Sequence, residues 1–284
     1  IYTLSLHDAL PIWSAMKKGS ILKKFISLGL CAATAIVFTA CSDGSGGSSS
    51  SDSTGKAKYI VATEPTYAPF EYTDENNKII GLDVDIMDAI AEDQGFEIEW
   101  SSLAFDSLFP ALNSGNADIV AAAVSSNPDR EKQADFSEGY YVTGDSMAVK
   151  SDSKVNTIDE LSPDSVVAVQ IGTTLVDKVQ KLIDEGKVGS IVQLDTVSTC
   201  MLQLQNGDVD AVAADSLTID DYISSQGKAK NIGEFYFDEE NPMRIAVKKG
   251  NAELLDKINS GLKHIKENGK YAEICKKWNV EPLK

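Results

Sequence analysis

The chain has 284 residues, enough for one large or two modest domains, and its 43% hydrophobic and 24% charged residues exclude a wholly disordered or fibrous chain. With 43 acidic and 26 basic residues the net charge is −17, so we expect no binding to nucleic acid and no electrostatic attachment to anionic lipids. Two histidines and four scattered cysteines exclude a His-rich metal site and a disulfide scaffold, and we predict neither a metal nor a cofactor.

The first 41 residues include the pattern of an export signal. Residues 1–15 show no periodicity, and we interpret them as a non-native upstream scar. From Met16 onward, four lysines precede the apolar run Phe25–Phe38. This run is too short to span a bilayer comfortably but suits a signal peptide, which we predict at residues 16–41.

Two interpretations of Cys41 remain open. The run Phe38-Thr39-Ala40-Cys41 resembles the lipobox of bacterial lipoproteins, whose cysteine is lipidated, although Phe38 stands where leucine is usual. The alternative is an ordinary secretory signal that is cut nearby. In residues 42–56, 11 of 15 residues are Ser or Gly, which is typical of a flexible tether. An anchor followed by a tether favours an exported domain held to the cell membrane by a lipid on Cys41, facing the periplasm or the extracellular side.

From Lys58 onward, strand and helix patterns alternate, which predicts an α/β fold with mostly parallel sheets. Strands are predicted at 59–63, 96–100, 118–124, 165–171 and 210–214. Helices are predicted from Leu82 to the glycine at 95, at 105–113, from the Gly172-Thr173-Thr174 turn through 183, and at 196–205. Cys200 and Cys275 fall inside helices, and we interpret both as small buried apolar residues rather than as a disulfide.

Two segments 92 residues apart match one another. The matching residues are Leu112, Gly115, Asp118, Val120, Ala121 and Ala122 in the first segment and Leu204, Gly207, Asp210, Val212, Ala213 and Ala214 in the second. Chance is one explanation, because helix-glycine-strand joints are common in α/β folds. Six coincidences in eleven positions favour two lobes of related topology.

The residues that follow the two matched strands become candidates for one shared cleft. They are Ala123, Val124 and Ser125 after the first strand and Asp215 at the end of the second. In open α/β sheets, ligands bind outside the carboxyl ends of the strands.

Three groups carry recognisable binding chemistry, each with an ordinary alternative. Arg130 is one of two arginines among 26 basic residues, and its planar fork can grip a carboxylate, but a solvated arginine at a helix start is equally compatible. The backbone of Gly172-Thr173-Thr174 could bind an anion, or a threonine could simply cap the helix. Asp215 could hold a ligand ammonium group or cap the next helix.

Several aromatic residues and one more carboxylate could complete a pocket wall. They are Glu64, Tyr67, Phe70, Phe105, Tyr140 and Tyr141. Taken singly, such aromatic residues more often belong to the core.

From Lys58 to the C-terminus the chain resembles the bacterial extracellular solute-binding proteins of family 3, the polar amino-acid receptors of ABC importers. The matching stretches are 62–72 (ATEPTYAPFEY), 81–85 (GLDVD), 105–112, 127–130 (NPDR), 135–137 with 140–141, 172–174 (GTT), 210–212 with 215, 267–271 (ENGKY) and 276–278 (KKW). The resemblance implies a type II periplasmic-binding-protein-like fold with two lobes joined by two hinge strands. Lobe 1 is expected at 57–142 and 246–284, and lobe 2 at 143–245.

The resemblance also implies roles for individual residues. Arg130 would clamp the α-carboxylate of an amino acid, helped by the backbone around Thr173 and Thr174 and by the hydroxyl of Ser125. Asp215 would hold the α-ammonium group, with a backbone carbonyl near Ala123 and Val124 assisting. Tyr67 and Phe105 would pack on the ligand, while Glu64 and Gln170 would face its side chain.

Departures from the family pattern leave the ligand open. Glu64 replaces the common Asp, Leu175 follows Thr174 where some basic-amino-acid receptors have a polar residue, and Met243-Arg244 replaces the usual Tyr-Gly. We expect a polar or basic ligand such as glutamine, arginine, lysine or histidine, a monomeric protein and an ABC permease as partner. The alternative is an exported enzyme on the same scaffold, resembling a prephenate or arogenate dehydratase, which would need a poised acid or base.

Overall fold

The computed structural model describes residues 56–283. The predicted scar, the signal peptide with Cys41, and residues 42–55 of the tether lie outside the described residues. None of the helices within 56–283 is both long enough and apolar enough to cross a membrane.

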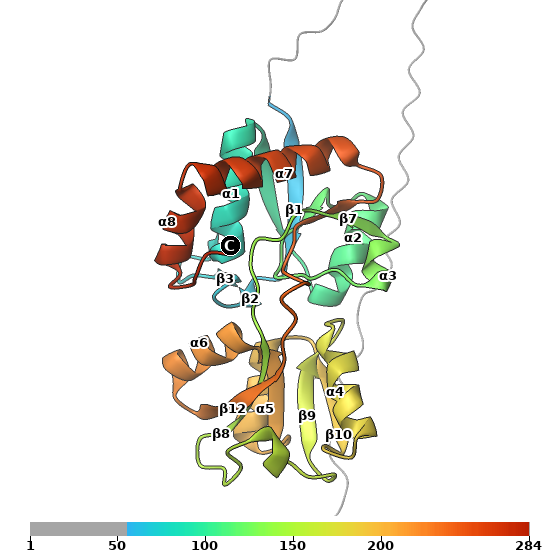
Figure 1. Ribbon diagram of the computed structural model, residues 1–284, viewed down its shortest axis with the longest axis vertical. Helices are drawn as coiled ribbons and strands as arrows, with labels where there is room; N and C mark the ends of the chain where they lie inside the picture. Colours follow the sequence, from blue (N-terminus) through green and yellow to red (C-terminus); the bar gives the residue numbers. More distant parts are fainter. Residues whose placement is uncertain (1–55, 284) are drawn as a thin grey trace, which may run out of the picture. The chain divides into compact units, whose positions relative to one another are not determined.

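The first lobe is built on a five-stranded sheet in the order β5-β1-β6-β13-β7, of which Figure 1 labels β1 and β7. Its strands are β1 (Lys58–Thr63), β5 (Glu97–Ser102), β6 (Ile119–Val120), β7 (Ala134–Phe136) and β13 (Ala246–Lys248). Its helices are α1 (Leu82–Gln94), the 3₁₀ turn η1 (Phe105–Ser107), α2 (Leu108–Ser114), α3 (Pro128–Glu131), α7 (Ala252–Glu267) and α8 (Lys270–Lys277). A small antiparallel sheet joins β2 (Thr66–Tyr67), β3 (Glu71–Thr73) and β4 (Ile79–Ile80).

The second lobe repeats this plan in the order β10-β9-β11-β8-β12. Its strands are β8 (Asp145–Lys150), β9 (Val166–Gln170), β10 (Ser190–Leu194), β11 (Ala211–Asp215) and β12 (Ala229–Tyr236). Its helices are the 3₁₀ turn η2 (Ile158–Glu160), α4 (Leu175–Asp184), α5 (Val197–Asn206) and α6 (Ser216–Gln226). Cys200 on α5 and Cys275 on α8 are buried and unpaired, as expected.

The two sheets have the same topology, which confirms the predicted two-lobe α/β fold. In each sheet three neighbouring strands are parallel, and the fourth, β13 or β8, runs antiparallel to the strands on both of its sides. The chain passes between the lobes at 137–144 and again at 237–245, and Figure 1 shows both crossings. The crossings pair with one another at an antiparallel bridge between Tyr141 and Met243.

The matched segments occupy the same place in the two sheets. Gly115 and Gly207 both end a helix in the left-handed conformation, with φ of 79° and 83°. Each matched aspartate then binds the neighbouring strand in the same way. The Asp118 carboxylate accepts a hydrogen bond from the Ile60 N–H at 2.8 Å, and the Asp210 carboxylate accepts one from the Val166 N–H at 2.8 Å. The repeat therefore reflects related architecture.

One predicted strand was too long. The expected strand at 118–124 is regular only over Ile119–Val120, and the chain then leaves the sheet. Within the rest of the expected range, Ala123 adopts a left-handed φ of 50°, which is incompatible with an extended strand. Similarly, the helix expected from Phe105 begins with a 3₁₀ turn, and its α-helical part starts at Leu108.

Gly81 is the residue on which the entry into α1 depends. Its φ is 149°, and a Cβ atom at this position would lie 1.9 Å from the Phe70 carbonyl oxygen. We expect Gly81→Ala to destabilise the protein by about 3 kcal/mol or more, because both the backbone conformation and the available space exclude a side chain. Urea unfolding would measure the loss.

Gly250→Ala is the matched control for this prediction. Gly250 also has a positive φ, of 85°, but nothing lies within 4 Å of a Cβ atom there. Gly250→Ala should therefore lower the free energy of unfolding by only about 1–2 kcal/mol, the cost of a left-handed conformation for a residue with a side chain. Equal losses in the two variants would contradict the steric argument.

Candidate functional site

A pocket between the lobes collects most of the residues predicted from sequence. Nine of the eleven predicted binding residues line it: Tyr67, Phe105, Ala123, Ser125, Arg130, Gln170, Thr173, Thr174 and Asp215. The other two, Glu64 and Val124, lie behind its wall. Phe70, Tyr140 and Tyr141, which the sequence offered as further aromatic walls, are also absent from the lining, and Phe70 and Tyr140 belong to the core.

Arg130 is a buried cation, so the solvated alternative is wrong. Only 8% of the residue is exposed, and the guanidinium lies over two aromatic rings, 5.6 Å from the centroid of Phe105 and 5.1 Å from that of Phe109. It donates to the carbonyl oxygens of Ser125 at 2.8 Å and Gly172 at 3.1 Å. Burial lowers the pKa of Arg130 to about 10, which still leaves the group charged at neutral pH.

The start of α4 lines the pocket from the second lobe, next to Arg130. Gly172 takes a φ of 79°, and Thr173 folds back so that its hydroxyl donates to the Gln170 carbonyl at 2.8 Å. Thr174 holds the N-cap position, but its side chain accepts no capping hydrogen bond. The first backbone N–H groups of α4 are thus not capped by that threonine, and they carry the positive end of the helix dipole.

Asp215 supplies the buried anion. It stands at the N-cap position of α6, yet its carboxylate does not cap the helix, so the capping alternative is wrong for the side chain. The carboxylate instead accepts a hydrogen bond from the Tyr67 hydroxyl, which in turn accepts one from the Asp215 N–H at 3.2 Å. Burial, and then the charge of Asp145, raise the pKa of Asp215 to about 7.

A contact that the sequence did not reveal fixes the pocket wall at Ala123. The Asp83 carboxylate accepts hydrogen bonds from the Ala123 N–H at 2.7 Å and from the Tyr140 hydroxyl at 2.6 Å. Asp83 is only 2% exposed, and burial raises its pKa to about 6 despite these two donors. The left-handed conformation of Ala123 is therefore held by a buried acceptor on the first turn of α1.

Glu64 reaches the pocket only through another side chain. It is buried, accepts hydrogen bonds from the Thr66 hydroxyl at 2.5 Å and from the Gln170 amide at 3.2 Å, and its pKa is raised by burial. Gln170 also donates to the Asp195 carbonyl at 3.0 Å. Val124 is buried in the first lobe's core, where its carbonyl accepts from the Arg244 N–H at 2.8 Å.

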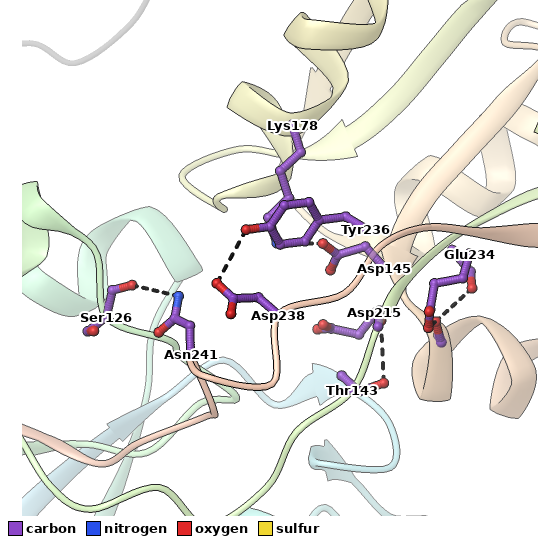
Figure 2. Close-up of polar contacts among 12 residues, drawn as sticks. Ser126, Thr143, Asp145, Lys178, Asp215, Glu234, Tyr236, Asp238 and Asn241 are labelled. Carbon is purple, nitrogen blue, oxygen red and sulfur yellow. Dashed lines mark hydrogen bonds and ion pairs between the residues drawn. The ribbon is translucent and has the colours of Figure 1, made fainter.

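The sequence missed a second polar group in the lining, shown in Figure 2. Its members are Thr143, Asp145, Lys178, Tyr236, Asp238 and Asn241, and Met243 lies in the lining as well. One signal was available, because Lys178 follows Thr174 by four residues and must share its face of the helix. The rest depends on strand register and on the two crossings, which no local pattern revealed.

Comparison with known proteins agrees with this geometry. Residues 59–281 match the profile of the bacterial extracellular solute-binding proteins, family 3. The chain is 33% identical to a "probable histidine-binding protein" of Neisseria gonorrhoeae, with 90% of this chain and 96% of that protein covered. It is 32% identical to the arginine-binding extracellular protein ArtP of Bacillus subtilis, with 90% and 98% covered.

A solved structure extends the likeness to three dimensions. An ancestral arginine-binding protein bound to arginine superposes with a TM-score of 0.73 at 35% identity, covering 78% of this chain and 98% of that one.

Proposed function

Because the chain belongs to the bacterial extracellular solute-binding proteins of family 3, we propose that it binds a polar or basic L-amino acid between its lobes and passes it to the permease of an ABC importer. The ligand class comprises glutamine, arginine, lysine and histidine. Histidine and arginine appear in the names of its relatives, which supports this range. Closure around the ligand would be favoured only by its better contacts with both lobes at once.

One observation carries the proposal. Arg130 and Asp215 come from different lobes, line the same pocket and have opposite charges, yet within residues 56–283 neither forms a salt bridge. A buried charge without a partner is costly, and an amino-acid zwitterion would supply a partner to each. Arg130 and the start of α4 would hold the carboxylate, and Asp215 with Tyr67 would hold the ammonium group.

The ligand side chain is assigned to the region of Gln170. Phe105 and Tyr67 provide aromatic surfaces, and the Gln170 amide is oriented by Glu64 and by the Asp195 carbonyl. Because the Gln170 amide is held by these two hydrogen bonds, its remaining hydrogen-bonding capacity is available to a polar side chain of the ligand. This arrangement supports a polar or basic ligand over an aliphatic one.

We further propose that the protein is exported, anchored by a lipid at Cys41, and monomeric. Mass spectrometry of the protein from its native membrane would test the anchor, since a diacylglyceryl group on Cys41 is expected there. An unmodified N-terminus near this position would support the ordinary secretory signal instead.

We propose that the protein is not an enzyme. A dehydratase would need an acid or base facing its substrate. Glu64, the candidate that the sequence favoured besides Asp215, is hydrogen-bonded behind the pocket wall, and Asp145, which lines the pocket, is paired with Lys178. A thermal-shift screen that includes prephenate and arogenate beside the amino acids tests this assignment together with amino-acid binding.

A thermal-shift screen against all twenty amino acids, with prephenate and arogenate included, tests the function. A ligand present at about a hundred times its Kd stabilises the folded state by about 2.7 kcal/mol, which for a protein of this size raises Tm by roughly 5–10 °C. A polar or basic amino acid that gives this rise without being consumed is the expected result. If no amino acid shifts Tm and prephenate or arogenate is consumed, the protein is an enzyme and the proposed receptor function is wrong.

A further inference from the structure

The pocket contains a second buried carboxylate and a second cation, paired with each other. Lys178 on α4 places its ammonium nitrogen 2.5 Å from the carboxylate of Asp145, and the two side chains are only 20% and 6% exposed. The same nitrogen lies 4.1 Å from the ring centroid of Tyr236, so the aromatic face stabilises it as well. Figure 2 shows Lys178 extending to Asp145 beside Asp215 and Asp238.

Strand register places this pair next to the proposed ammonium site. Asp145 and Asp215 are directly opposite each other in the antiparallel pairing of β8 with β11. Like charges at such positions repel, and two neighbouring buried carboxylates cannot both ionise at neutral pH unless a cation compensates one of them. Lys178 supplies that cation, and its charge lowers the pKa of both carboxyl groups against the effect of burial.

Several other ionisable groups face this pair. Asp215 is faced by Tyr67 from β2, Asp83 from α1 and, at longer range, Glu71 from β3, while Glu234 on β12 acts on Asp145. The charge of Asp83 raises the pKa of Asp215, the charge of Glu234 raises that of Asp145, and the charge of Asp215 raises that of Glu71. Only the Tyr67 hydroxyl stabilises the charged form of Asp215 by a side-chain hydrogen bond. Among the charged groups that shift the pKa of Asp215, Lys178 is the one cation.

We propose that Lys178 is a positioning residue for ligand binding, which neutralises Asp145 and thereby keeps Asp215 ionised and able to hold the ligand's ammonium group at neutral pH. This inference rests on the proposed function for the identity of the ligand. It gives α4 two tasks, since the helix start lines the carboxylate end of the site while Lys178, one turn later, controls the ammonium end.

Calorimetric titration between pH 5.5 and 8.5, with the amino acid that gives the largest thermal shift, tests the inference. In Lys178→Met the loss of the cation should raise the pKa of Asp215 by one unit or more, so that affinity at pH 7 falls about fivefold or more and the deficit narrows toward pH 8.5. Lys178→Met combined with Asp145→Asn should restore the wild-type profile, because the repelling charge is then gone too. Lys181→Met, on the exposed face of the same helix, is the control and should change nothing.

Two results would overturn the proposal. One is an unchanged pH profile in Lys178→Met. The other is a loss of the same factor at every pH, without rescue in the double variant, which would indicate a purely structural role.

A titration of the ligand-free protein separates this inference from the proposed function. Carboxyl-carbon NMR, with Asp215 assigned by comparison with Asp215→Asn, would follow its pKa directly. A higher pKa in Lys178→Met supports the electrostatic role even if no amino acid binds to the wild type, which would contradict the receptor function alone. An unchanged pKa contradicts the inference whatever the protein binds.

Discussion

Replacing Arg130 with alanine is expected to reduce amino-acid affinity by about a hundredfold or more, because the ligand carboxylate would be buried without its partner. The guanidinium is enclosed by Phe105 and Phe109 and already donates to two backbone carbonyls, so its orientation toward the pocket is fixed before ligand arrives. Isothermal titration calorimetry with the amino acid identified in the screen would measure the loss.

Two further variants make this prediction specific. Arg130→Lys keeps the charge but lacks the planar fork, and it should recover only part of the affinity. Lys132→Ala, two residues away, removes an exposed cation paired with Asp129 and should bind normally. Because Arg130 also contacts Gly172 in the other lobe, circular dichroism should confirm that each variant is folded. Affinity within a few-fold of wild type in Arg130→Ala would remove the carboxylate role.

Replacing Asp215 with asparagine is expected to reduce affinity by a similar factor at pH 8, since the ligand ammonium group loses its buried counter-charge. The pH dependence should change as well. In the wild type the pKa of Asp215 is raised to about 7, so affinity is full above this pH and falls by about tenfold for each pH unit below it, as the carboxylate becomes protonated. Asp215→Asn cannot titrate, and its weak residual binding should be nearly flat between pH 5.5 and 8.

Asp208→Asn is the matched control, because it removes the same charge from an exposed position in the turn before β11. It should retain both the affinity and the pH profile of the wild type. If Asp215→Asn bound normally, the ammonium group would have to be held elsewhere, and the missed carboxylate at Asp145 would be the next residue to examine.

Local sequence patterns were sufficient to predict much of the fold. The repeat predicted two related lobes because each copy contains a complete joint, with a buried leucine, a left-handed glycine and an aspartate that binds the adjacent strand. The same patterns overestimated the strand before Ala123. Apolar character suggested that the strand continued, whereas a distant carboxylate, Asp83, holds the turn that ends it.

The candidate site was partly predictable for a related reason. Arg130 and Asp215 stood out because an arginine in a lysine-rich chain and an aspartate ending an apolar strand are locally unusual. Asp145 and Lys178 have ordinary neighbours in the sequence, and their importance arises from the pairing of β8 with β11 and from the approach of α4. Glu64 is absent from the pocket lining, and its link to the pocket is the hydrogen bond that it accepts from Gln170, which does line the pocket.

The bonds of the second crossing determine where the two lobes can pivot. Met243 bridges both Ser125 and Tyr141, the Arg244 N–H donates to the Val124 carbonyl, and the Asn241 amide donates to the Ser126 carbonyl at 3.1 Å. The crossing is thus fastened to the first lobe from residue 241 onward, while β12 belongs to the second lobe up to Tyr236. Within the second crossing only the short segment 237–240 lacks such ties, so this crossing would concentrate its torsional change in four residues during opening and closing, and the pocket wall at 124–126 would move with the first lobe.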